Sequence, residues 1–378
     1  MLEKIKNIEF LRFIFAIEIV YFHFFIYSKS VFPDFALYKK LFINSTDAFL
    51  CVEYFFIIAG FFMYYHLYYK NDSTFEYSIN KIIRFWPLLA FSIFVIFLFS
   101  LFHFGKFHFY SNILNLLFLY CTGMLNFPVN NGHSWFICIL FWVSIMYHYL
   151  HKCFDKKIFN LIVFGAVFCS YAILIQDTNG YIGSKAHMVK HLFSYGMLRG
   201  FASIGLGYFI GMLWQKISIY VKDFKIKNQF KSVLFFTAIS ALELYLSGFI
   251  LYYSIFSKIE YKNNMIFIVA FVFLFLLFLA KKGILSKLLE NNISVFLGKF
   301  SYSIYIMQAA GFFMTKPYLW GNKDFMYSHP YMNISLTVFV CVLIGILSRL
   351  FIEVKITKYL KDRLNNLNIE KSPTHQSN

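Results

Sequence analysis

An arginine and a histidine lie eleven residues apart in the first apolar stretch of the sequence. In a helix, eleven steps of about 100° place Arg12 and His23 on one face, about 16 Å apart along the axis, while Glu18 falls on another side. An imidazole can accept a proton near neutral pH, and a guanidinium can orient a substrate or stabilise its negative charge. The spacing therefore indicates a polar channel along one helix face. The alternative is that Arg12 reaches the water-facing end of the helix and that His23 is hydrogen-bonded in the core.

Three more charged residues can extend this chemistry. Glu53, in the second apolar stretch, can pair with Arg12 or hold one tautomer of His23, because an unpaired carboxylate in an apolar helix is costly. A structural and a chemical role are both open for it. Lys81 and Arg84 are three residues apart and share a helix face, where they can bind phosphate oxygens. The alternative for this pair is the ordinary excess of basic residues at the cytoplasmic ends of membrane spans.

Two further groups of side chains can contact a second substrate. His133 and Trp135 precede an apolar stretch and can line the access route of a sugar, although an aromatic belt at a membrane surface explains Trp135 equally well. A polar stripe follows at positions i, i+4 and i+7, formed by Ser301, Tyr305 and Gln308, with Tyr302 beside them. Hydrogen bonding between helices is the alternative explanation of this stripe.

The sequence shows no set of residues with the spacing of a metal site, and we expect no metal. The six cysteines are scattered without a C-x-x-C pair and are expected to be small buried hydrophobes. The other histidines lie mostly at the ends of apolar stretches or in loops, without acids at a recognisable ligand spacing: His66, His103, His108, His148, His151, His187, His191 and His329. Gly205, Gly207 and Gly211 lie inside an apolar stretch with no preceding strand, and predict close helix packing rather than a nucleotide-binding loop.

The composition indicates which elements must position these residues. Of 378 residues, 60% are hydrophobic, 23% aromatic and only 14% charged, with a mean hydropathy of +0.62. A soluble domain has about half apolar and a quarter charged residues, so an ordinary soluble enzyme is excluded in favour of a membrane protein. The net charge of +17 is spread over many loops, which does not fit nucleic-acid binding and indicates contact with anionic membrane lipids.

The apolar stretches predict an all-α bundle of about ten transmembrane helices, since about 20 apolar residues cross the hydrocarbon core. The predicted spans are 9–28, 47–67, 84–104, 134–150, 158–176, 197–215, 231–253, 263–280, 294–315 and 331–352. The stretch 112–127 is also apolar but ends in Asn126, Phe127 and Pro128. We interpret it as an interfacial or re-entrant segment rather than a span.

The loop charges predict the orientation of this bundle. With ten spans and the N-terminus inside, the inner segments hold about twice as many Lys and Arg residues as the outer loops, as the positive-inside rule requires. Both termini are therefore expected in the cytoplasm. Residues 1–360 are expected to form a single membrane-embedded domain, followed by a polar cytoplasmic tail at 361–378.

Several motifs, taken in order, resemble those of a known family. They are R-x10-H in the first span, Cys51-Val-Glu-Tyr-Phe-Phe-Ile-Ile-Ala-Gly-Phe61, Lys81-Ile-Ile-Arg-Phe-Trp-Pro87, His133-Ser-Trp-Phe-Ile137, Gly298-Lys-Phe-Ser-Tyr-Ser-Ile-Tyr-Ile-Met-Gln308 and Phe351-Ile-Glu353. Together they resemble the bacterial acyltransferase-3 family of membrane acyltransferases over residues 8 to about 360. The sequence departs from the family's usual residues where Glu53 replaces Asp, Lys81 replaces Arg and Gln308 replaces His.

The resemblance implies an integral membrane O-acyltransferase of the bacterial inner membrane. Such an enzyme transfers an acyl group, here expected to be acetyl, from cytoplasmic acetyl-CoA to a hydroxyl of a cell-surface polysaccharide or a lipid-linked glycan. His23 matches the family's essential histidine and becomes the expected general base, with Arg12 and Glu53 as further catalytic residues. Lys81 and Arg84 become the expected acyl-CoA site. Direct transfer and a covalent acyl-histidine intermediate are both open, as is a homo-oligomer.

Two other classes of membrane protein compete with this prediction. A transporter or flippase of lipid-linked saccharide would show broken helices in paired halves and inverted repeats, and no internal symmetry is evident in the sequence. A membrane glycan polymerase or glycosyltransferase commonly depends on acids or Arg in large outer loops. The outer loops predicted here are short and poor in Asp and Glu.

Overall fold

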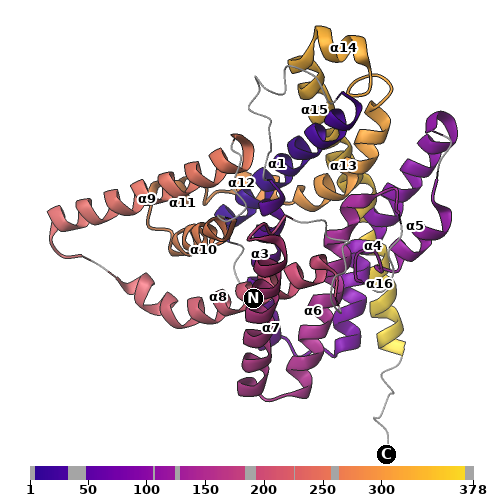
Figure 1. Cartoon of the computed structure of the whole chain (residues 1–378). Helices are drawn as coiled ribbons and strands as arrows, with labels where there is room; N and C mark the ends of the chain where they lie inside the picture. Colours follow the sequence, from indigo (N-terminus) through magenta and orange to yellow (C-terminus); the bar gives the residue numbers. More distant parts are fainter. Residues whose placement is uncertain are drawn as a thin grey trace, which may run out of the picture.

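The fold is that of a computed structural model, which describes residues 5–32, 48–104, 107–123, 128–183, 193–224, 226–256 and 264–370. It is 85% helical, and these residues form no strand (Figure 1). The prediction of an all-α fold is therefore confirmed. In Figure 1, α8 and α9 extend to the left, whereas α4, α5 and α16 lie at the right.

The described residues form eleven longer and four shorter α-helices. The longer ones are α1 Lys6–Val31, α3 Phe49–Tyr69, α4 Thr74–Phe99, α6 Trp135–Cys153, α7 Lys156–Thr178, α8 Tyr195–Asp223, α9 Gln229–Phe256, α10 Asn264–Ala280, α13 Ser301–Thr315, α15 Pro330–Ser348 and α16 Val354–Glu370. The shorter ones are α5 Phe109–Leu116, α11 Ile284–Leu288, α12 Asn292–Gly298 and α14 Lys323–Ser328. Two π-helical turns, η1 Ser100–Phe104 and η4 Arg349–Glu353, continue α4 and α15, and a 3₁₀ turn, η2 Gly132–Ser134, leads into α6.

In the described part of the chain, eight helices are long and apolar enough to cross a membrane. They coincide with eight of the ten predicted spans, so the protein is a multi-pass membrane protein. The predicted span 263–280 is α10, which is apolar but has only 17 residues. The predicted span 294–315 is broken at Lys299 and Phe300 into α12 and α13. The segment 112–127, whose last four residues lie outside the described part, overlaps the end of α5, whose eight residues are about 12 Å long and cannot cross a bilayer.

Close packing of α3 against α8 forms the centre of the bundle. A Cβ atom on Gly207 would lie 2.0 Å from the carbonyl oxygen of Ile57, and one on Gly60 would lie 1.9 Å from that of Ile204. Only glycine allows the two backbones to approach so closely, as in other membrane helix pairs. The predicted packing role of the glycines in this stretch is confirmed at Gly207.

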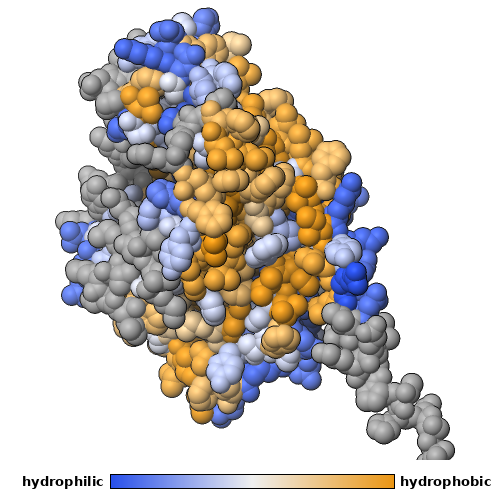
Figure 2. Space-filling view, turned by 90° about the vertical axis from the view of Figure 1, so that its right-hand side faces the viewer, coloured by the Kyte–Doolittle hydropathy of each residue, from blue (hydrophilic) through white to orange (hydrophobic). Residues whose placement is uncertain are grey.

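The outer surface has the polarity of a membrane protein. Figure 2 shows hydrophobic side chains over the middle of one face, with hydrophilic ones gathered at its top and along its lower and right-hand edges. On α7 the apolar side chains Leu161, Phe164 and Phe168 are all exposed, which fits contact with lipid. Near the C-terminus, α16 continues to Glu370, so the first residues of the predicted polar tail are helical.

Candidate active site

A cavity of about 710 Å³ opens between α1, α3, α4, α13 and the turn η4. Positive charge dominates its wall, since the described residues that line it include seven Lys and Arg side chains and two acids. The basic residues are Arg12, Lys70, Lys81, Arg84, Lys299, Arg349 and Lys361, and the acids are Glu9 and Glu353. Such a wall favours an anionic ligand, because a cleft lined by one sign of charge concentrates the opposite charge.

Each of the two acids forms an ion pair with a neighbouring arginine. Nη1 of Arg12 lies 3.0 Å from both carboxylate oxygens of Glu9, and Nη1 of Arg349 lies 2.7 Å from Oε1 of Glu353. Arg12 therefore borders the cavity, as the sequence predicted, but it is already paired on its own helix. The net positive charge of the cavity comes from the remaining basic residues.

Lys81 and Arg84 are available for such a ligand. Neither forms an ion pair with any acid among the residues the structure describes. Instead, Nζ of Lys81 lies 5.1 Å from the ring centre of Tyr77, and the guanidinium carbon of Arg84 lies 5.6 Å from that of Phe85. Aromatic rings of this kind hold a cation in place without neutralising it. The two side chains lie on one helix, α4, at the spacing that predicted a shared face, and both line the cavity.

The local sequence of α4 explains how this helix is positioned. Ser73 and Glu76 form a capping box that starts the helix. Pro87 lies inside it and cannot donate to the carbonyl of Ile83. The hydroxyl of Thr357 on α16 donates to that carbonyl at 3.4 Å. These contacts fix the turn that carries Lys81 and Arg84.

Ser301 and Tyr302, predicted to contact substrate, also line the cavity. The Ser301 hydroxyl donates to the carbonyl of Gly298 at 2.8 Å, across the break between α12 and α13. The Tyr302 hydroxyl donates to the carbonyl of Phe85 on α4 at 2.7 Å. Both hydroxyl protons are thus used in the fold, and what each side chain can still offer a ligand is its oxygen as an acceptor.

A hydrogen-bond network fixes the tautomer of His23. Nε2 of Gln308 donates to the carbonyl of Tyr305 at 2.8 Å, so the amide oxygen of Gln308 faces His23. That oxygen lies 3.0 Å from Nδ1 of His23 and can only accept, so Nδ1 carries the proton. The lone pair of His23 then lies on Nε2, for which the described residues show no hydrogen-bond partner, and a general base requires such a lone pair. Sequence reasoning placed Gln308 on a polar stripe but missed this contact, because nothing in the spacing joins positions 23 and 308.

His133 lies directly beside His23. Their ring centres are 4.0 Å apart, and Nε2 of His133 is 3.1 Å from the hydroxyl of Tyr27. The turn η2 that carries His133 is held by Asn131, which donates to Ser92 on α4 at 2.8 Å. Nδ1 of His133 is buried and has no partner among the described residues. The histidine predicted to contact a sugar thus belongs to the surroundings of the expected base.

The cavity and the histidine pair meet at Tyr305. This residue lines the cavity, and its hydroxyl donates to the carbonyl of His133 at 2.9 Å. His23 itself is absent from the cavity wall that the structure describes. The expectation that Arg12 and His23 share one wall is therefore corrected: Arg12 borders the cavity, and His23 lies one layer of side chains beyond its inner end.

Glu53 pairs differently from the prediction. Its carboxylate forms a buried ion pair with Arg199 and accepts a hydrogen bond from Ser203 at 2.6 Å. Both partners are on α8, which the glycine contacts bring against α3, so the nearest buried cation is Arg199 rather than Arg12. The Arg199 guanidinium also lies 4.7 Å from the ring centre of Trp135, and occupies a ring face that a sugar would need.

One side-chain cluster was missed by the sequence analysis. His66, Asp72 and His148 offer ligand atoms that all lie within 4.8 Å of one another. The three positions are six and 76 residues apart, a spacing that matches no metal motif, and the fold alone brings them together.

The apolar helices, the apolar outer surface and the basic internal cavity define a multi-pass membrane protein with a cavity whose charge favours an anionic ligand. The sequence model of the acyltransferase domain of the acyltransferase-3 family matches residues 5–353. The chain therefore belongs to that family, and the resemblance stated from its motifs is confirmed. Comparisons with curated proteins and with solved structures give no significant match.

Proposed function

We propose that the protein is an integral membrane O-acyltransferase that moves an acetyl group from acetyl-CoA to a hydroxyl of a cell-surface polysaccharide or a lipid-linked glycan. The observation that carries the proposal is the connection between a basic cavity and a histidine with a fixed tautomer, through Tyr305 and His133. An acyl-CoA has phosphates that the basic cavity can bind and a thioester that can react near the histidine.

In this proposal, Lys81 and Arg84 bind the phosphates of the donor. A guanidinium binds phosphate oxygens in pairs and an ammonium binds them as a point charge, and both side chains face the cavity with no acidic partner in the described part of the chain. The phosphates would lie at the α4 side of the cavity. The acyl end of the donor would then extend towards Tyr305.

The histidine supplies the chemistry. Nε2 of His23 accepts the proton of the acceptor hydroxyl while that oxygen forms a bond to the thioester carbonyl carbon. The carbon–sulfur bond then breaks, and the leaving thiolate takes the proton from the imidazolium, giving the ester and free coenzyme A. Gln308 holds the tautomer throughout, because its amide oxygen accepts from Nδ1.

The proposed location is the bacterial inner membrane, with the donor arriving from the cytoplasm. The loop charges support this orientation, since four of the seven basic residues of the cavity lie on segments assigned to the inner side: Lys70, Lys81, Arg84 and Lys361. The acceptor would then approach His23 from the other side of the membrane.

Radiolabelled acetyl-CoA incubated with membranes that contain the protein tests the proposal. Label is expected in envelope glycan with the wild type and with His329→Ala, a matched control at the start of α15, and none above background with His23→Ala. Equal labelling by His23→Ala would remove His23 from the mechanism. Absence of transfer by the wild type, with lipid-linked saccharide moved across vesicles, would favour a transporter instead.

A further inference from the structure

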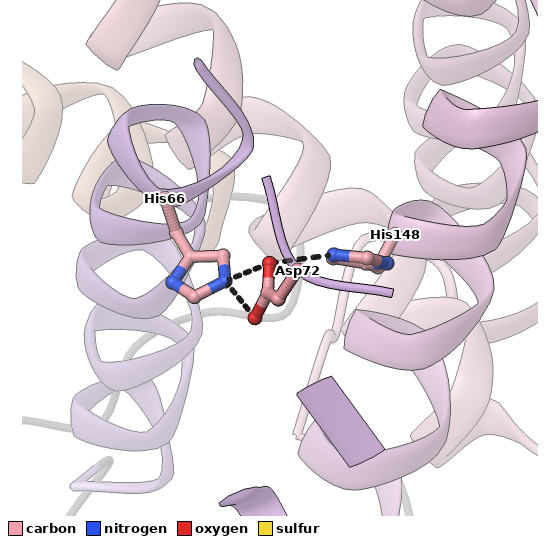
Figure 3. Close-up of side chains that lie close together, drawn as sticks. All are labelled: His66, Asp72 and His148. Atoms are coloured by element: carbon pink, nitrogen blue, oxygen red, sulfur yellow. Dashed lines mark hydrogen bonds and ion pairs between the residues drawn. The ribbon is translucent and has the colours of Figure 1, made fainter. Parts of the chain in front are cut away.

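Two histidines and one aspartate converge beside the cavity, at the end of the bundle where α3 and α6 finish. Figure 3 shows His66 of α3 and His148 of α6 pointing from opposite sides at Asp72, which lies in the loop between α3 and α4. Nε2 of His66 is 2.9 and 3.1 Å from the two carboxylate oxygens. Nε2 of His148 is 3.4 Å from Oδ1.

These separations suit a shared metal ion. With metal–ligand bonds of about 2.0–2.1 Å, neighbouring ligand atoms lie about 2.9 Å apart in octahedral geometry and about 3.3 Å apart in tetrahedral geometry. The nitrogen–oxygen distances in this cluster span the same range. All three ligand atoms lie within 4.8 Å of one another, so an ion can contact all three side chains once the two imidazole nitrogens move closer together.

The surrounding residues already orient both rings. Nδ1 of His148 lies 3.1 Å from the Thr74 hydroxyl, which can accept its proton and leave Nε2 free to bind a metal. The His148 ring stacks on Tyr77 with centres 4.3 Å apart, and the His66 ring lies 4.9 Å from the same tyrosine. A hydrogen bond to the second nitrogen of a ligating histidine is a usual feature of metal sites.

We propose that His66, Asp72 and His148 bind a divalent transition-metal ion, with Zn²⁺ the best match. Two imidazole nitrogens and one carboxylate form a donor set that Zn²⁺ accepts, whereas Mg²⁺ and Ca²⁺ prefer oxygen ligands. Three protein ligands leave a fourth position for water. The side chain of His148 is only 1% exposed, while those of His66 and Asp72 are 25% and 17% exposed, so the ion can enter from one side.

The bound ion would fix the position of the loop beside the cavity. His66 lines the cavity, and the loop that carries Asp72 leads directly into α4, the helix that bears Lys81 and Arg84. Coordination would connect this loop to α6 as well as to α3. The competing explanation is a metal-free cluster in which Asp72 accepts hydrogen bonds from both imidazoles. That cluster needs a proton on each Nε2, whereas metal binding needs both lone pairs.

Metal content of the full chain, purified in detergent without a polyhistidine tag and exposed to a mild chelator and then to Zn²⁺, tests the proposal. About one Zn²⁺ per chain is expected for the wild type, and a loss of binding for His66→Ala and His148→Ala. His151→Ala is the matched control, because His151 lies one turn later on α6 and contacts Tyr68 and Phe159 instead. It is expected to bind zinc as the wild type does.

A second pair of measurements separates lost ligands from lost folding. Asp72→Asn keeps a hydrogen-bond acceptor but loses the charge, so zinc affinity should fall at least tenfold while the elution profile of the protein is unchanged. Co²⁺ in place of zinc should give visible ligand-field bands in the wild type that Zn²⁺ displaces. A wild type that binds no more zinc than His148→Ala, or that gives no such bands with Co²⁺, would overturn the proposal. Neither measurement depends on acyl transfer.

Discussion

The base proposed for acyl transfer depends on one amide. Gln308 uses its nitrogen on the carbonyl of Tyr305 and therefore presents its oxygen to Nδ1 of His23. The energy that separates the two tautomers of a neutral imidazole is small, so one such hydrogen bond decides which nitrogen has the lone pair. Gln308 is a positioning residue in this arrangement, since it acts through His23.

Replacing Gln308 tests that role at the level of one hydrogen bond. Gln308→Leu should lower kcat about tenfold, less than the 10²–10⁴-fold that removal of the general base itself costs, because it leaves Nδ1 without its acceptor. Gln308→His, which restores the residue usual in the family, should recover most of the rate. Steady-state kinetics with acetyl-CoA provide the measurement, with KM for the donor unchanged in both variants. A rate for Gln308→Leu equal to that of the wild type would contradict the tautomer argument.

Arg84 should act on donor binding rather than on the chemical step. A charge-assisted hydrogen bond to phosphate contributes about 1.5–3 kcal/mol, so Arg84→Ala should raise KM for acetyl-CoA about tenfold or more with kcat little changed. Arg84→Lys keeps the charge but loses the planar guanidinium, so its KM for acetyl-CoA should lie between that of the wild type and that of Arg84→Ala. Arg363, which is exposed on α16 and outside the cavity wall, provides the control variant Arg363→Ala. An equal KM for Arg84→Ala and Arg363→Ala would show that Arg84 marks only the membrane orientation.

At the scale of helices, the buried pair of Glu53 and Arg199 joins α3 to α8. Removing one partner of such a pair leaves the other charge buried, at a cost of about 3–5 kcal/mol in the free energy of unfolding. Glu53→Gln should therefore lower stability in detergent, and the double variant Glu53→Gln/Arg199→Met should be more stable than the sum of the two single changes predicts. Thermal unfolding followed by fluorescence gives both values.

The same variant separates the two roles that the sequence left open for Glu53. A structural carboxylate should leave kcat per folded molecule close to that of the wild type. A Glu53→Gln protein that is stable but has no turnover would show that Glu53 takes part in catalysis and that its ion pair with Arg199 is not its main role.

How much of the site followed from the sequence differs between helices. Lys81 and Arg84 were placed correctly because helical spacing is local and three residues always share a face. The Glu53 pairing was wrong because it depends on which helix packs against α3, and that is decided by Gly60 and Gly207 against backbone carbonyls. The break between α12 and α13 was also missed, since Lys299 and Phe300 interrupt the helix without proline. Gly298 allows this break to lie against α1, because a Cβ there would be 2.5 Å from that of Glu9.

For the whole molecule, hydropathy was the strongest guide. Eight predicted spans are long apolar helices, because a lipid environment imposes both the length and the composition of a crossing segment. The contacts that make the site were not predictable in this way. His23, His133 and Gln308 come from three distant parts of the sequence, and only the packing of α1, the turn η2 and α13 brings them together.

The orientation of the molecule in the bilayer can be tested with two of its own cysteines. Cys153 is exposed at the end of α6, next to Lys152, and Cys169 is exposed on α7 beside the exposed Phe168. A membrane-impermeant maleimide reacts with a thiolate in water. A cysteine that faces the hydrocarbon does not react, because neither the reagent nor a charged thiolate is stable there. Cys153 should therefore be labelled in inside-out vesicles and not in right-side-out ones. Cys169 should be unlabelled in both and should react only after denaturation.

Single variants Cys153→Ser and Cys169→Ser assign the label, since the other four cysteines are buried. Labelling of Cys153 in right-side-out vesicles would show that the predicted orientation is wrong. The basic cavity would then open away from the cytoplasm, and cytoplasmic acetyl-CoA could not be its donor. Labelling of Cys169 in intact vesicles would place the face of α7 in water, and the apolar surface that defines this protein as membrane-spanning would need another explanation. The expected pattern requires both that α7 faces lipid and that the basic end of the bundle faces the cytoplasm.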